Sequence, residues 1–242
     1  MKTIDNTSLT VEDVRNFDEW AVDGIGMLSI VLMENAGKSV ADEIYRNHFE
    51  TDTSFEGVAV FCGTGYNGGA GLVAARHLFV KGVPVVVYIV GGISCFTLDT
   101  ELNFRILKKL GIEAHPLLAD RDLAKIKVGE KYLVVDAIFG VGVDRQIIGF
   151  YRKAIDCINE MQNITISVDV PSGFNADNGK HWGISIRANK TITMIGHKRG
   201  FESENASDLL GEVLIASVGI DTIGDYDIKA EEVDEIVEEG EK

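Results

Sequence analysis

The chain contains few basic residues, few cysteines and few prolines, and it has no long hydrophobic run. Its 23 Lys and Arg residues stand against 38 Asp and Glu residues, which gives a formal net charge of −15. Nucleic acids and anionic membranes attract clustered basic side chains, so this charge argues against both kinds of partner. An anionic ligand would need local groups, such as backbone N–H groups, a cation or a few basic side chains.

No apolar stretch approaches the roughly 18–20 residues that a helix needs to span a bilayer. The first ten residues, MKTIDNTSLT, lack the basic and apolar regions of a signal peptide. The three cysteines, Cys62, Cys95 and Cys157, are widely spaced and odd in number, which favours reduced thiols over disulfides or a metal cluster. These absences predict a cytoplasmic protein.

Strand-like and helix-like segments alternate after residue 58, which predicts a parallel sheet with helices on both faces. Residues 8–49 show helical periodicity, and Thr10 with Asp13 resembles a capping box. The expected strands are Val58–Cys62, Pro84–Val90, Tyr132–Asp136, Ile164–Asp169, Thr191–Ile195 and Val213–Ala216. The expected helices are Leu72–Val80, Leu98–Leu110, Gly149–Met161 and Ser207–Leu210. We expect one α/β domain over residues 1–220 and an acidic tail over residues 221–242.

A glycine-rich segment after the first expected strand is the most informative part of the sequence. Its glycines are Gly63, Gly65, Gly68, Gly69 and Gly71, and we interpret the segment as a turn before the helix Leu72–Val80. Glycine lets a ligand approach the main chain closely. The free N–H groups and the dipole of a helix start favour an anion, most often phosphate. The segment therefore predicts a nucleotide-phosphate site at the end of a strand.

The spacing Gly63-Thr-Gly65-Tyr-Asn-Gly68 matches the G-x-G-x-x-G pattern of dinucleotide-binding folds. Those folds place an acidic residue about 20 positions later, at the end of the next strand, where it holds the ribose hydroxyls. Here the next strand, Val83–Val90, ends in two glycines and no carboxylate. This absence argues against an ordinary NAD-dependent dehydrogenase, and Asn67 inside the turn suggests another use of the loop.

Asp136 and Asp169 each end an expected strand, and each precedes a glycine-containing turn. Ligands of open α/β sheets sit beyond the carboxyl ends of the strands, so these residues could meet Asn67 and Ser172 in one crevice. An amide, a carboxylate, a hydroxyl and loop carbonyls form an all-oxygen shell that suits a hard cation, and the low charge favours a monovalent one. The alternative is that each aspartate only caps a nearby loop or helix.

Several ordered blocks resemble the NAD(P)H-hydrate epimerase family, also called the YjeF N-terminal domain family. The resemblance covers most of residues 10–220. Its most specific part is Gly65-x-Asn67-Gly68-Gly69 followed by Val168-Asp169-x-Pro171-Ser172-Gly173. The other blocks are Leu32–Gly37, Val134–Gly142 and Lys190–Phe201.

The resemblance implies a Rossmann-like three-layer α/β/α sandwich with a mostly parallel central sheet, usually in a homodimer. It implies one potassium ion per subunit, bound by Asn67, Asp136 and Ser172. The implied substrate is the hydrate of NADH or NADPH, whose R and S forms are interconverted so that a separate S-specific dehydratase can repair both. The implied substrate contacts are Tyr66, Asn67, Gly68, Gly69, Ala70, Gly140, Val141, Gly142, Val143, Asp144 and Asp169.

The proposed chemistry needs a group that can give and take a proton. The carbon that bears the added hydroxyl lies next to the ring nitrogen, whose lone pair can expel that hydroxyl once an acid protonates it. Water can then return to the other face of the ring with the help of a base. One carboxylate could serve both steps, and we expect Asp169 to be this catalytic group because of its position.

The glycine-rich loop departs from the family pattern, which reads G-N-N-G-G-D-G. Here Tyr66 replaces an amide and Ala70 replaces a carboxylate. The alternative function is therefore a catalytically weakened nucleotide-binding sensor or scaffold of the same fold. An interaction domain in RNA metabolism is disfavoured by the retained polar residues and the acidic charge. For the basic segment His197–Arg199, both a phosphate contact and an exposed loop stay open.

Overall fold

A computed structural model describes residues 8–50, 54–204 and 206–220. Seven strands form one sheet in the order β3-β2-β1-β4-β5-β6-β7, and all neighbouring strands pair in parallel. The strands are β1 (Gly57–Cys62), β2 (Val85–Val90), β3 (Glu113–Leu117), β4 (Tyr132–Ala137), β5 (Thr165–Val168), β6 (Lys190–Met194) and β7 (Glu212–Ala216). The predicted parallel sheet is confirmed, and the six expected strands agree with the observed ones to within one residue at every end.

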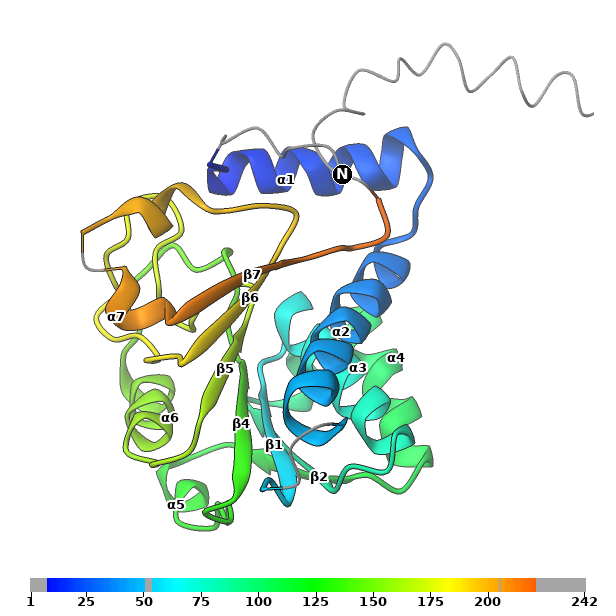
Figure 1. The fold of residues 1–242 in the computed structure, drawn as a ribbon, viewed down its shortest axis with the longest axis vertical. Coiled ribbons are helices and arrows are strands. Elements are labelled where there is room, and N and C mark those ends of the chain that lie inside the picture. Colours follow the sequence, from blue (N-terminus) through cyan, green and yellow to red (C-terminus); the bar gives the residue numbers. More distant parts are fainter. Residues whose placement is uncertain (1–7, 51–53, 205, 221–242) are drawn as a thin grey trace, which may run out of the picture.

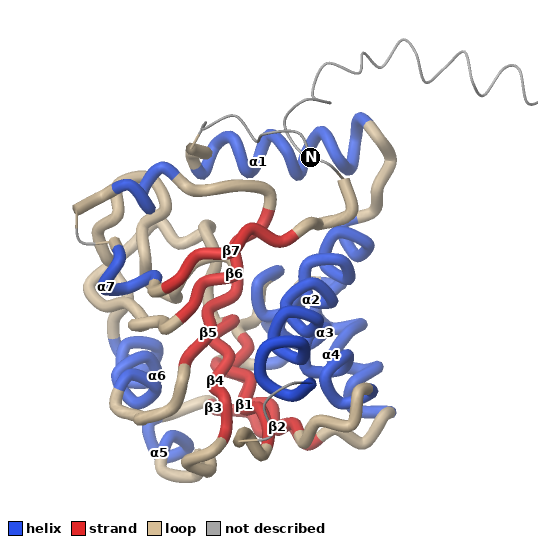
Figure 2. Tube along the Cα trace, in the orientation of Figure 1, coloured by secondary structure: helices blue, strands red, loops and turns tan. Residues whose placement is uncertain are grey.

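Helices cover both faces of this sheet (Figure 1). One layer contains α2 (Ser29–Tyr45), α3 (Tyr66–Val80) and α4 (Leu98–Lys109), and the other contains α5 (Asp120–Leu123), α6 (Gly149–Asn159) and α7 (Ser207–Leu210). Figure 2 shows the strands as a twisted central layer between these two groups. The Rossmann-like three-layer α/β/α fold is therefore confirmed.

The central strands are apolar on both sides because each side faces a hydrophobic core. Val58 and Val60 of β1 belong to the core beneath α2 and α3, whereas Ala59 and Phe61 belong to the core on the α6 side. All six residues of β1 are buried. This alternation follows from the two-residue period of a strand, and it explains why the sequence shows short Val- and Ile-rich runs.

Helix α3 corrects the prediction for the glycine-rich segment. The helix begins at Tyr66 rather than Leu72, so most of the expected turn forms the first turns of the helix. The glycines are needed here for close packing. A Cβ atom on Gly68 would lie 2.0 Å from the carbonyl oxygen of Gly63, and one on Gly71 would lie 2.5 Å from Cβ of Ala137. Helix α3 can therefore lie directly against the sheet and the preceding loop.

Among the described strands and α-helices, one strand and one helix were not expected from the sequence. Strand β3 reads Glu-Ala-His-Pro-Leu and lies at the edge of the sheet, where polar side chains and proline are tolerated. Helix α5 is a single short turn after it. Neither has the apolar pattern of a buried element, so neither gives a strong sequence signal.

Helix α1 (Val11–Glu19) and a following π-helical turn, η1 (Trp20–Gly24), lie outside the two layers, along one end of the molecule (Figure 1). The predicted capping box between Thr10 and Asp13 is confirmed. The predicted acidic tail, residues 221–242, lies outside the described residues. Among the described helices, none has both the length and the apolar character required to cross a membrane.

Candidate functional site

A cleft of about 1180 Å³ lies where the carboxyl ends of the central strands meet α1 and α2. It is the place that parallel α/β sheets commonly use for ligands. The predicted site residues that line it are Tyr66, Asn67, Ala70, Gly140, Val141, Gly142, Val143, Asp144 and Asp169. Asp136 and Ser172 are fully buried beneath it, and Gly68 and Gly69 are buried in the first turn of α3. The roles of all these residues stay predictions.

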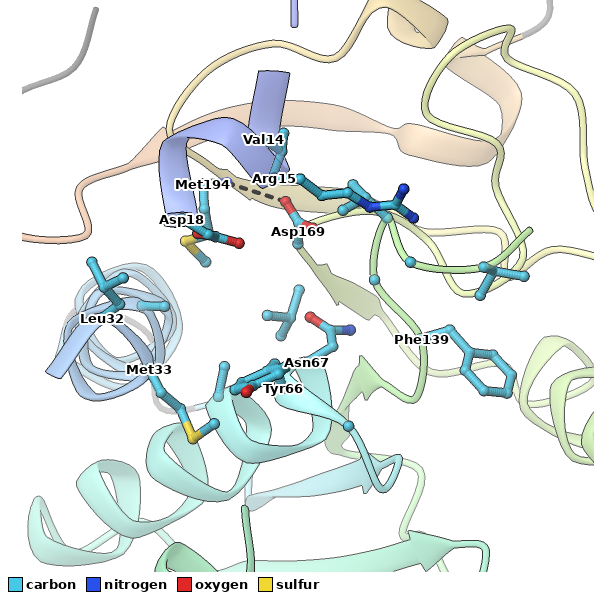
Figure 3. Close-up of a pocket in the computed structure, with 18 of the residues that line it drawn as sticks. Val14, Arg15, Asp18, Leu32, Met33, Tyr66, Asn67, Phe139, Asp169 and Met194 are labelled. Atoms are coloured by element: carbon cyan, nitrogen blue, oxygen red, sulfur yellow. Dashed lines mark hydrogen bonds between the residues drawn. The ribbon is translucent and has the colours of Figure 1, made fainter. Parts of the chain in front are cut away.

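The first turn of α3 presents two polar side chains to the cleft. Tyr66 is 60% exposed, and its ring lies beside Asn67 (Figure 3). The Nδ2 atom of Asn67 is buried and has no hydrogen-bond partner. Gly68 and Gly69 instead pack closely, against Gly63 and against Met33 with Thr100. An unpartnered buried amide is costly in a native protein, so Asn67 is a candidate ligand-binding residue.

Beneath the cleft, Asp136 and Ser172 are bonded to each other. Oδ1 of Asp136 accepts from the Ser172 hydroxyl at 2.5 Å, and Oδ2 accepts from the Ser172 backbone N–H at 2.8 Å. Ser167 Oγ and the Ile138 backbone N–H complete the set, at 2.9 and 3.2 Å. Burial raises the pKa of Asp136, while these hydrogen bonds oppose that shift.

The loop after β4 connects this buried pair to the open cleft. The backbone N–H of Phe139 donates to Ser172 Oγ at 2.8 Å. A Cβ atom on the next residue, Gly140, would lie 3.3 Å from Oδ2 of Asp169 and 3.4 Å from Cγ of Asn67. The structure thus brings the three distant segments of the predicted site together around one loop.

The donor set of this region suits a potassium ion. Its oxygens come from the Asp136 carboxylate, the Ser172 hydroxyl and nearby loop carbonyls, and oxygen-only sets are typical of hard cations. The Asn67 amide has an unused buried end and lies beside Gly140, which follows the residue bonded to Ser172. The three predicted ligand residues therefore fit such an ion.

Asp169 follows β5 and is held by a buried lysine. The Lys198 ammonium lies 3.1 Å from Oδ1 of Asp169, and Lys198 is fully buried. The ammonium also donates to Thr193 Oγ1 at 2.9 Å and to the carbonyl of Met194 at 2.7 Å. Lys198 is therefore not part of an exposed basic loop, and it does not line the cleft. The sequence did not reveal this role, because a lysine in a loop has no periodic signal.

Two neighbouring strands end in an unusual backbone conformation at the cleft. Asp169 has φ of 66° and Ile195 has φ of 70°. Aspartate tolerates this left-handed region, but a β-branched isoleucine adopts it only when the surrounding structure forces it. Such strain is common at functional sites. Here it sets the direction in which the Asp169 carboxylate leaves the sheet.

Asp18 was not predicted as a site residue from the sequence, and α1 directs it into the cleft (Figure 3). Burial raises its pKa to about 6, and the nearby negative charge of Asp169 adds to the shift, while Lys198 opposes it. The available signal is helical spacing. Asp18 follows Val14 by four residues, and Val14 and Phe17 form the buried face of α1.

Comparison with known proteins gives relatives along most of the chain. A protein from Oenococcus oeni named NAD(P)H-hydrate epimerase is 32% identical, over 88% of this chain and 96% of its own. A protein of the same name from Elusimicrobium minutum is 34% identical, over 91% of this chain and 96% of its own. A bifunctional NAD(P)H-hydrate repair enzyme from Moorella thermoacetica is 36% identical over 88% of this chain. This chain spans 40% of the length of that bifunctional relative.

The fold is shared with a solved structure. The crystal structure of the yeast protein ynu0 superposes with a TM-score of 0.72, covers 93% of this chain and is 24% identical to it. The family model described as YjeF-related protein N-terminus matches residues 29–200. That match includes α2, the glycine-rich start of α3, the strand ends with Asp136 and Asp169, and the lysine behind Asp169. The chain therefore belongs to the family of YjeF-related N-terminal domains.

Proposed function

We propose that this protein is an isomerase that interconverts the R and S forms of hydrated NADH or NADPH. The observation that carries the proposal is the convergence of Asp169 and Asn67 on one large cleft, in a chain whose relatives are named NAD(P)H-hydrate epimerase. The reaction is a metabolite-repair step, because both forms then become available to an S-specific dehydratase.

Asp169 is the proposed catalytic residue. It lines the cleft, it is 15% exposed, and its counterion Lys198 is out of reach of solvent. The ammonium at 3.1 Å holds one carboxylate oxygen of Asp169 in place, and the carboxylate can accept a proton from attacking water. In the reverse step the protonated acid returns that proton to the leaving hydroxyl. The C–O bond breaks, the nitrogen lone pair forms a C=N bond, and water leaves.

The nucleotide part of the substrate would lie along Tyr66–Ala70 and Gly140–Asp144. The start of α3 offers backbone N–H groups and the positive end of the helix dipole to a diphosphate. Arg15 and Arg145 also line the cleft, and neither forms an ion pair with a residue in the described part of the chain. In a protein with a net charge of −15, two unpaired arginines in one cleft favour an anionic ligand.

One potassium ion per subunit is the proposed cofactor, held by Asn67, Asp136 and Ser172. When bound, the ion would supply a positive charge beside the start of α3. The residues themselves hold the loop: Ser172 bonds both Asp136 and Phe139, and Phe139 precedes Gly140 in the cleft. The ion and the loop would therefore position the same part of the substrate.

A separate NAD(P)H-hydrate dehydratase is the proposed functional partner. Relatives from Moorella thermoacetica and Thermofilum pendens are named bifunctional repair enzymes, and this chain covers 40% and 38% of their lengths. We also propose a cytoplasmic homodimer, which does not bind nucleic acid or membranes. An exposed apolar row on α4, formed by Leu98, Leu102 and Ile106, supports the dimer.

The decisive experiment couples this protein to an S-specific dehydratase. The R form of hydrated NADH is supplied as substrate, and recovery of NADH absorbance is followed in potassium chloride and in choline chloride. Acceleration by the protein supports the epimerase, and a greater rate in potassium supports the ion. Binding of NADH without acceleration would instead favour the sensor, for which the buried Ala70 in place of a carboxylate is the supporting observation.

A further inference from the structure

Helix α1 is fixed to the loop that carries Lys198. The backbone N–H of Leu9 donates to the carbonyl of His197 at 2.7 Å, and the N–H of Arg199 donates to the carbonyl of Leu9 at 2.8 Å. Asp177 Oδ1 accepts from the first N–H of the helix at 2.9 Å. The side chains of Val14 and Phe17 form the buried face of α1. The position of α1 is therefore set relative to Lys198 and Asp169.

This attachment places a second carboxylate in the cleft. Asp18 projects from α1, whereas Asp169 comes from the end of β5, so two different elements bring the acids into the cleft (Figure 3). Asp18 is exposed at the surface of the cleft, and the surrounding cleft walls already withdraw part of the water around its carboxyl group. The ring of a substrate bound in the cleft beside both acids would contact the Asp18 carboxyl group.

The two carboxylates have different environments. Asp169 has Lys198 at 3.1 Å, whereas no residue in the described part of the chain forms a hydrogen bond or an ion pair with Asp18. The other charged side chains that line the cleft are Arg15, Glu19, Asp23, Asp144 and Arg145. When two acidic side chains have different environments, one can serve as the proton donor and the other as the proton acceptor.

We propose that Asp18 is a second catalytic residue, which exchanges a proton with the substrate on the opposite side of the ring from Asp169. The proposal rests on the epimerase function. Epimerisation requires water to leave one face of the ring and return to the other, and a single carboxylate has direct access to one face. Enzymes that displace a group at a sugar carbon with inversion use two carboxylates in the same way.

In each turnover the substrate receives one proton from one carboxyl group and releases one proton to the other. Protonated Asp18 gives its proton to the hydroxyl, the C–O bond breaks, and water leaves as the nitrogen lone pair forms a C=N bond. A second water then bonds to the opposite face, the C=N electron pair returns to nitrogen, and Asp169 takes the released proton. Proton exchange with solvent then restores protonated Asp18 and the Asp169 carboxylate for the next turnover. The reverse reaction uses the two residues in exchanged roles, and no oxidant or reductant is needed.

The test compares Asp18→Asn and Asp18→Glu with the wild-type protein in the dehydratase-coupled assay. We expect Asp18→Asn to lower kcat by about 10²–10⁴-fold, because it cannot donate the proton. Asp18→Glu retains a carboxyl group and should recover part of the rate, with a displaced pH profile. Binding of NADH should stay within about threefold, since Asn keeps the shape of Asp. Asp208→Asn, an exposed charge-matched change on α7, is the control.

A readout without turnover comes from carboxyl NMR titration of the wild-type protein. The raised pKa predicts one aspartate that titrates near pH 6 and whose signal disappears in Asp18→Asn. Because the step needs protonated Asp18, kcat should fall as the pH rises through about 6. If Asp18→Asn failed to fold, Asp18→Glu would still decide, through its pH profile and through the loss of the aspartate signal near pH 6.

The possible failures are distinct. A wild-type protein with no epimerase activity would overturn the proposed function itself. An active wild type with near-normal kcat in Asp18→Asn and an unchanged pH profile would overturn the role of Asp18 alone. A titration of Asp18 close to pH 4 would also contradict the inference.

Discussion

The contact between Asp169 and Lys198 is the residue pair on which the site depends most. Lys198 has no exposed surface, and its ammonium is surrounded by Asp169, the Thr193 hydroxyl and the carbonyls of Met194 and Gly196. A buried charge is tolerated only when it is paired and hydrogen-bonded. The lysine thus fixes the direction of the Asp169 carboxylate and supplies its counterion.

We expect Lys198→Met to weaken both folding and catalysis. Methionine fills a similar space but leaves Asp169 without its counterion, and breaking a buried pair in this way costs about 3–5 kcal/mol. Asp169 keeps 15% of its surface exposed, so the lower end of that range is expected. Urea unfolding gives the stability change, and the coupled assay gives kcat. Lys180→Met, at an exposed lysine, serves as the control and should change neither. Equal effects of both substitutions would argue against a special role for Lys198.

Single site residues can be predicted from the sequence when their sequence neighbours form a recognisable pattern. Asp136 and Asp169 follow apolar strands and precede glycines, and Asn67 lies among glycines, so each has a signal in its neighbours. Lys198 lies in a mixed loop, and its burial depends on α1 and β6 meeting there. Asp18 has a helical spacing that points to the buried side of α1, but only the tertiary position of α1 directs it toward Asp169.

At the scale of elements, the close packing of α3 determines the shape of the cleft. Its first turn lies against the loop after β1, and its next turn lies against β4. Side chains at Gly68 or Gly71 would push the helix away from the sheet. Tyr66 and Asn67 would then move relative to Gly140 and Asp169. The glycines therefore serve the site through packing, in addition to any contact with phosphate.

We expect Gly68→Ala to destabilise the protein and to weaken NADH binding. The added Cβ atom would lie 2.0 Å from a backbone oxygen, which cannot move as a side chain does. Overpacking of this kind costs about 1–3 kcal/mol. Thermal unfolding and a binding titration measure the two effects. Gly92→Ala is a suitable control, since its backbone suits alanine and the nearest atom to its new Cβ would be the Ser94 hydroxyl oxygen at 3.5 Å. A variant of Gly68 as stable as the control would refute the packing argument.

The central elements could be predicted because burial on both faces leaves a strong pattern. Strands β1, β2, β4, β5, β6 and β7 are all found near the expected positions. Strand β3 was missed because it lies at the edge of the sheet and contains polar residues and a proline. The start of α3 was missed because glycine has a low intrinsic helix propensity, and here tertiary packing outweighs that propensity.

At the scale of the whole molecule, the net charge of −15 opposes self-association, so any dimer needs a specific surface. Helix α4 offers one. Leu98, Leu102 and Ile106 recur every four residues along it and are 84%, 46% and 37% exposed. The first turn of the helix contains Asp99 and Glu101, and its last turn contains Lys108 and Lys109. Two copies packed antiparallel across a twofold axis would place acidic turns opposite basic turns.

We expect the protein to be a dimer in solution and Leu98→Glu to weaken the association by about tenfold or more, which equals roughly 1.4 kcal/mol. Leu98 is already 84% exposed, and a glutamate suits the first turn of a helix, so folding should be unaffected while a charge enters the contact. Sedimentation equilibrium over a range of concentrations measures the effect. Val80→Glu, at a residue 70% exposed on α3, is the matched control and should leave the association unchanged. A wild-type protein that stays monomeric at high micromolar concentration, or equal weakening by both substitutions, would rule out α4 as the dimer contact.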